Sequence, residues 1–116
     1  MRWPSFVSYF CAGMLLTNSV PHLLIAVTGR RNRTPFGCHS SAVVNLLWSG
    51  LNVSSGYLLV RVADRREGVN KADATAWQLS YEAGCLALAL FGVVYSWRSS
   101  RQRGQEVDRA ERVDRP

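Results

Sequence analysis

Charged residues are missing from two long stretches of this 116-residue sequence. No Asp, Glu, Lys or Arg lies between Arg2 and Arg30, and none lies between Arg33 and Arg61. A helix needs about 20 apolar residues to cross the roughly 30 Å of hydrocarbon in a bilayer, whereas the surface helices of soluble proteins carry a charged face. The two stretches therefore predict membrane-spanning helices, and a soluble helical bundle is the less favoured alternative.

Cysteine is also scarce, and its spacing excludes the common cysteine-based sites. Cys11, Cys38 and Cys85 are far apart, which indicates neither a disulfide framework nor a CxxC metal site. Cys38 and its neighbour His39 together provide too few ligands for a structural zinc site. We expect no metal ion and no cofactor, and we expect the cysteines to pack as small apolar side chains.

The N-terminal stretch lacks the cleavage site of a signal peptide. Arg2 followed by apolar residues is how such peptides begin, but no small-x-small motif follows at the right distance, and apolar residues continue to Val27. We therefore predict an uncleaved first helix over residues 5–27. Pro21 has no amide hydrogen to donate to the carbonyl of Thr17, so we expect a kink at Pro21.

Two further helices are predicted over residues 42–61 and 74–98. The last charge-free run, from Ala83 to Trp97, spans a bilayer comfortably only when the residues before it are included. Glu82 then lies inside the bilayer or at its edge, where an ionisable residue is a candidate functional site. The alternatives are that Glu82 reaches the headgroups or forms an ion pair with Arg61 at the same membrane face.

The predicted fold is therefore all-α, an integral membrane protein with three transmembrane helices in a small bundle. Residues 1–103 form a single transmembrane domain, and residues 104–116, which are polar and rich in charge, form a disordered cytoplasmic tail.

Basic residues are distributed unequally between the two sides of this predicted topology. The first connection and the C-terminal tail hold nine arginines, whereas the N-terminus and the second connection hold five basic residues. Basic residues are enriched on the cytoplasmic side of membranes. We therefore expect the N-terminus outside and the C-terminus in the cytoplasm, in the inner (plasma) membrane. This topology also explains the net charge of +6, so we do not expect nucleic acid as a partner.

Polar residues interrupt the apolar helices at helical spacings. Asn18 and His22 are four residues apart and therefore share one face of the first helix. On the second helix, Asn45, Ser49 and Asn52 follow one another at spacings of four and three residues. At about 1.5 Å per residue, the two sets lie at matching depths. We predict that these five residues form a polar seam between the first two helices; simple hydrogen bonding between helices is the conservative interpretation of each.

The pattern of these residues resembles a group of uncharacterised small bacterial inner-membrane proteins. The similarity covers about residues 18–59 and consists of an N-x-x-P-H motif, a loop with Pro and Phe, and an N-x-x-W-x-x-x-N-x-x-x-G-Y pattern. In this chain the matching residues are Asn18, Pro21, His22, Pro35, Phe36, Asn45, Trp48, Asn52, Gly56 and Tyr57. No activity is established for the group. The resemblance therefore implies a membrane location and the same polar residues, and implies no mechanism.

Two classes of function remain open. The first is a non-enzymatic membrane protein that acts by association, as an accessory subunit or a homo-oligomer, because three helices enclose little interior volume. The second is an oligomeric small-solute or proton-coupled transporter or channel in which His22, and also Glu82, handles protons, since histidine side chains titrate near neutral pH. A membrane enzyme or haem protein is the least favoured, because His22 is the only candidate in the spans for a buried base or ligand.

Overall fold

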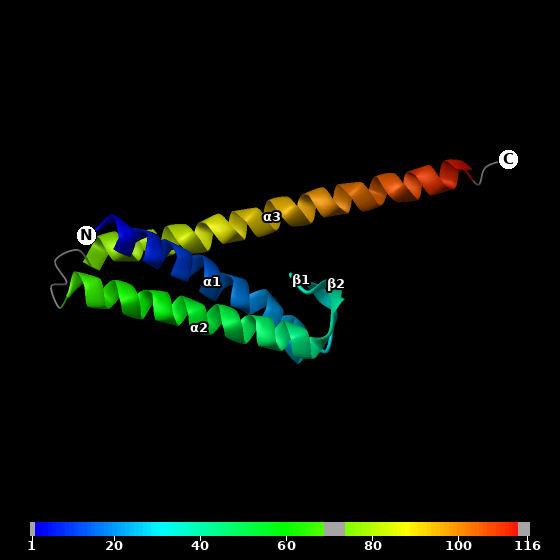
Figure 1. Cartoon of the computed structure of the whole chain (residues 1–116). Helices are drawn as coiled ribbons and strands as arrows, with labels where there is room; N and C mark the ends of the chain where they lie inside the picture. Colours follow the sequence, from blue (N-terminus) through cyan, green and yellow to red (C-terminus); the bar gives the residue numbers. More distant parts are fainter. Residues whose placement is uncertain (1, 69–73, 114–116) are drawn as a thin grey trace.

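The chain folds into three long helices and one small β-hairpin (Figure 1). This computed structural model describes residues 2–68 and 74–113. In chain order the elements are α1 (Trp3–Val27), β1 (Asn32–Thr34), β2 (Gly37–Ser40), α2 (Ala42–Glu67) and α3 (Ala74–Val113). All three helices are long and apolar enough to cross a membrane, as the charge-free stretches predict.

Helix α1 begins where Pro4 occupies the first turn, a position at which its missing amide hydrogen costs nothing. The helix ends before Gly29, whose φ of +68° is a left-handed conformation that glycine adopts readily. The helix is continuous through Pro21. A kink at Pro21 therefore stays a prediction.

Helix α2 begins at an N-cap and is longer than predicted. The Ser41 hydroxyl accepts a hydrogen bond of 3.3 Å from the amide of Val44, which satisfies one of the free amides of the first turn. Residues 62–67 continue the helix past the predicted end at residue 61, and Gly68 follows with a φ of +70°. Two carboxylates in this extension accept hydrogen bonds that anchor the extra turns: Asp64 from Tyr9 of α1, and Glu67 from the backbone amide of Arg2, the N-cap residue of α1.

Helix α3 continues far beyond the predicted span over residues 74–98. The sequence predicts a disordered tail from residue 104, but the structure is helical to Val113; residues 114–116 lie outside the described part of the chain. The segment after Trp97 is rich in Arg, Gln and Glu, which are strong helix formers. The Arg101 guanidinium also lies 4.8 Å from the centre of the Trp97 ring, an attractive cation–π contact. High polarity alone does not separate a solvent-exposed helix from a disordered tail.

Helix α1 is the central element, and both other helices pack against it (Figure 1). Helix α2 is antiparallel to α1, whereas α3 runs parallel to its N-terminal half and then diverges. Within the described residues, α2 and α3 share little contact with each other. Glycines allow the close approach of α1 and α3: a Cβ at Gly13 would overlap the Tyr81 carbonyl oxygen, and one at Gly84 would overlap that of Phe10.

Candidate functional site

All five residues of the predicted polar seam lie at the interface of α1 and α2, and hydrogen bonds between the two helices bring them together. The Asn18 side-chain amide donates a hydrogen bond of 3.2 Å to Asn52 Oδ1. One turn nearer the hairpin, the Ser49 hydroxyl donates to the carbonyl of Ser19 at 2.9 Å. Asn52 also donates to the carbonyl of Trp48 on its own helix at 2.7 Å. The side chains of this part of the seam therefore bond to the helix pair itself.

His22 and Asn45 form a buried contact of the seam, with 2.8 Å between His22 Nδ1 and Asn45 Oδ1. The Asn45 amide nitrogen donates to the carbonyls of Ser40 and Ser41 at 3.1 and 3.0 Å, which uses both of its hydrogens. The Asn45 atom that faces His22 is therefore the acceptor oxygen. His22 must donate through Nδ1, so in the neutral ring Nε2 carries the lone pair.

The β-hairpin covers the end of the seam at which His22 lies. Its strands are antiparallel, and the hydroxyls of Thr34 and Ser40 share a hydrogen bond of 2.6 Å across them. At the tip, the Phe36 ring packs edge-on against Trp48 with 5.8 Å between ring centres. Trp48 in turn packs edge-on against His22 at 6.5 Å. The hairpin is thus fixed to the seam through the Ser40 carbonyl and the Phe36 ring.

The sequence indicated only a turn-rich connection in place of this hairpin. The segment has no alternation of apolar and polar residues, which is the usual signal of a strand. The signal that could have found it is a short Pro-Phe-Gly turn at residues 35–37 with a hydroxyl residue on each side, Thr34 and Ser40.

A second polar cluster, which sequence reasoning missed, lies at the opposite end of the helices. The Tyr9 hydroxyl donates a hydrogen bond of 2.7 Å to Asp64 on α2, and its ring lies 5.7 Å from that of Trp77 on α3. The backbone amide of Arg2 donates to Glu67 Oε1 at 3.0 Å. Tyr9 therefore joins all three helices. Its partners are distant in sequence, so no local pattern points to this contact.

The predicted ion pair between Arg61 and Glu82 does not form within the chain. Arg61 lies on α2 and Glu82 on α3, and these helices pack on α1 with little contact to each other among the described residues. Glu82 accepts a hydrogen bond of 3.0 Å from Gln78 on its own helix. Both charged side chains are exposed. Equal membrane depth, on which the prediction rested, does not bring two side chains together when a third helix separates them.

The chemistry available in the seam is that of neutral amides, hydroxyls and one imidazole. Among the described residues, no group of three or more His, Cys, Asp and Glu side chains could hold a metal ion, and the Cys38 side chain lies outside those described. The chain matches no protein-family model, no curated protein and no solved structure.

Proposed function

We propose that this protein is a non-enzymatic integral membrane protein that acts by association, as an accessory subunit or a homo-oligomer. The observation that carries the proposal is the course of α3. After the crossing at Gly84 this helix leaves α1 (Figure 1), so its remaining membrane part has no helix of the described chain beside it. Leu86, Leu90 and Phe91 are each about two-thirds exposed there. Lipid can cover these side chains, but a second protein would add the close packing that holds membrane helices together.

The polar seam supports association over transport. The side-chain amide of Asn45 and the imidazole of His22 hold each other, and Asn18, Ser49 and Asn52 bond to the same helix pair. Polar groups used in this way fix the position of one helix on another. Within this proposal the seam is a structural clamp, and the partner binds elsewhere.

The alternative is an oligomeric small-solute or proton-coupled transporter or channel that uses His22, with Glu82 as a second proton-handling residue. The feature in its favour is His22 Nε2, which has no hydrogen-bond partner among the described residues while Nδ1 donates to Asn45. A ring held by one nitrogen can accept a proton on the other.

Mass measurement in native lipid nanodiscs tests the proposal. We expect particles that contain several copies of the 12.9 kDa chain, or one copy with a second, co-purifying protein. A single copy without a partner would contradict association. Ion or solute flux in liposomes that disappears in His22→Ala, with the particle mass unchanged, would favour the alternative.

The proposed location is the inner membrane, with the N-terminus outside and the C-terminus in the cytoplasm. Three spans place the arginines of the first connection on the same side as Arg98 and Arg101 of α3. An excess of arginine on that side favours the cytoplasm.

A further inference from the structure

Arg61 and Glu82 are two opposite charges on apolar helices, and neither has an ion-pair partner among the described residues. Each side chain is exposed on the outer surface of the helix bundle. Isolated charges in or near hydrocarbon are costly and are normally paired. The contacts between helices show how deep each charge lies.

Arg61 lies level with the first turns of α1. The hydrogen bond from Asn18 to Asn52 fixes the register of the antiparallel pair α1 and α2. Arg61 follows Asn52 by nine residues, and nine residues before Asn18 is Tyr9. Arg61 is therefore at about the depth of Tyr9.

Glu82 lies at the same level on the other side of α1. The Ser80 hydroxyl donates a hydrogen bond of 2.7 Å to the carbonyl of Phe6, which fixes the register of the parallel pair α1 and α3. Glu82 follows Ser80 by two residues, and two residues after Phe6 is Ser8. The two charges therefore differ in depth by about one residue, or roughly 1.5 Å along a helix.

Within one chain these charges cannot meet, because α1 lies between the helices that carry them. Copies of the chain inserted in the same orientation share the same depths, so the Arg61 of one copy is automatically level with the Glu82 of its neighbour. A planar guanidinium with five donors is well suited to a carboxylate partner. Exposed leucines flank both charges, Leu58 on α2 and Leu79 and Leu86 on α3, and could pack around the pair.

We propose that the protein self-associates in the membrane through a salt bridge from Arg61 of one copy to Glu82 of the next. This inference rests on the proposed function and names the partner as a second copy of this chain. An isologous dimer would contain two such bridges, and a ring would contain one at each contact. The salt bridge would neutralise both charges at the depth where each is costly alone.

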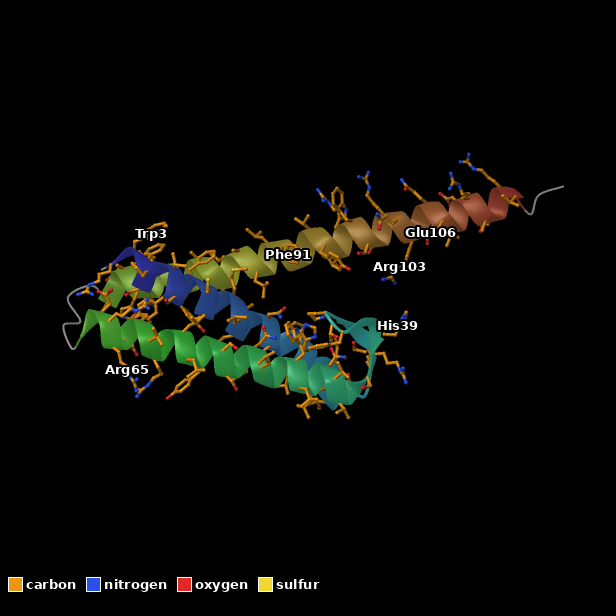
Figure 2. All side chains as sticks on the ribbon, in the orientation of Figure 1. Trp3, His39, Arg65, Phe91, Arg103 and Glu106 are labelled. Carbon is orange, nitrogen blue, oxygen red and sulfur yellow. The ribbon has the colours of Figure 1, made fainter. Side chains whose placement is uncertain are left out.

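Charge reversal tests this contact. The readout is the number of copies of the chain in each nanodisc, obtained from the mass of the particle. Arg61→Glu and Glu82→Arg should each weaken self-association by roughly tenfold or more, since like charges then face one another. The double variant, which exchanges the two charges, should recover the wild-type copy number. Arg65→Glu and Glu106→Arg are matched controls on the same two helices, where Figure 2 labels both positions, and they should leave the copy number unchanged.

A mixing experiment distinguishes loss of the salt bridge from misfolding of a variant. Arg61→Glu chains carry two acidic groups at the contact and Glu82→Arg chains carry two basic groups, so each should fail to associate alone. Co-expression should restore assembly as mixed particles, because every contact between unlike chains is complementary. Misfolded chains would not be rescued by one another.

The outcomes separate this contact from the proposed function. Single reversals that assemble like the wild type would overturn the salt bridge while leaving association intact, as would a single copy bound to a different protein. Reversals that fail alone and also fail when mixed would overturn the proposed contact as well. A wild-type chain that is monomeric without any partner would overturn both.

Discussion

Replacement of Gly84 by alanine tests the close crossing of α1 and α3. A Cβ at this position would overlap the Phe10 carbonyl oxygen, and it would lie 2.9 Å from the Phe10 carbonyl carbon and 3.2 Å from the Met14 amide nitrogen. All three atoms belong to the backbone of α1, so no side chain can move aside. The two helices must separate, by about 1 Å or more if ordinary contact distances are to be restored.

The expected loss of stability follows from that separation. Forcing an extra carbon into a well-packed contact costs typically about 1–3 kcal/mol, and a gap of half an ångström or more weakens every neighbouring contact. The hydrogen bond from Ser80 to Phe6 lies beside the crossing and would lengthen as well. The higher helix propensity of alanine offsets up to about 1 kcal/mol of this loss of stability. We expect Gly84→Ala to be destabilised by about 1–2 kcal/mol.

Gly92→Ala is the matched control, because it makes the same chemical change on the same helix. Among the described residues, nothing lies within 4 Å of a Cβ at Gly92. Only the propensity gain applies there, so this variant should be unchanged or more stable by up to about 1 kcal/mol. Titration with SDS from a mild detergent, followed by tryptophan fluorescence, measures both. Trp77, one of four tryptophans in the chain, lies against Tyr9 where α1 meets α3, so its contribution to the emission changes when these helices separate. Equal unfolding midpoints for the two variants would refute the close crossing.

Two further predictions concern the seam and the topology. Asn45→Ala should lower the free energy of unfolding by about 1–3 kcal/mol, because it leaves His22 Nδ1 and the Ser40 carbonyl without this partner. Asn18→Ala removes one hydrogen bond and should lower it by only about 0.6 kcal/mol in a membrane. The same SDS titration compares the two variants, and a larger loss for Asn18→Ala would show that the seam is not organised around Asn45. A reporter fused after Pro116 should be active only in the cytoplasm, and periplasmic activity would reverse the proposed orientation.

The long apolar helices were predictable, because long stretches without charge are characteristic of helices that are able to cross a membrane. The seam could be derived because two regular spacings, Asn18 to His22 and Asn45 to Asn52, lie at equal depth on helices joined by a short connection. Helices adjacent in sequence are usually adjacent in space, so depth alone was enough to pair them.

The same reasoning could not find which sides of α1 the other helices occupy. Depth placed Arg61 and Glu82 at one level but said nothing of the helix between them. The partner of Tyr9, Asp64, lies in a part of α2 beyond the predicted span, so the predicted helices do not include this contact. The closeness of Gly13 to Tyr81 depends on the crossing of two backbones, which spacing within one helix does not define.

Two kinds of contact hold α1 in the bundle, close helix packing in its N-terminal half and hydrogen bonds in its C-terminal half. This difference explains why the polar seam lies in the C-terminal half. In its N-terminal half α1 has a helix on each of two sides, and glycine crossings give the dense packing that stabilises membrane helices. In its C-terminal half α3 has diverged, and Pro21 removes one backbone hydrogen bond from α1. In a membrane, apolar side chains gain no hydrophobic free energy when a protein neighbour replaces lipid. Hydrogen bonds such as that from His22 to Asn45, together with the hairpin above them, are therefore what keeps α1 on α2 in this half.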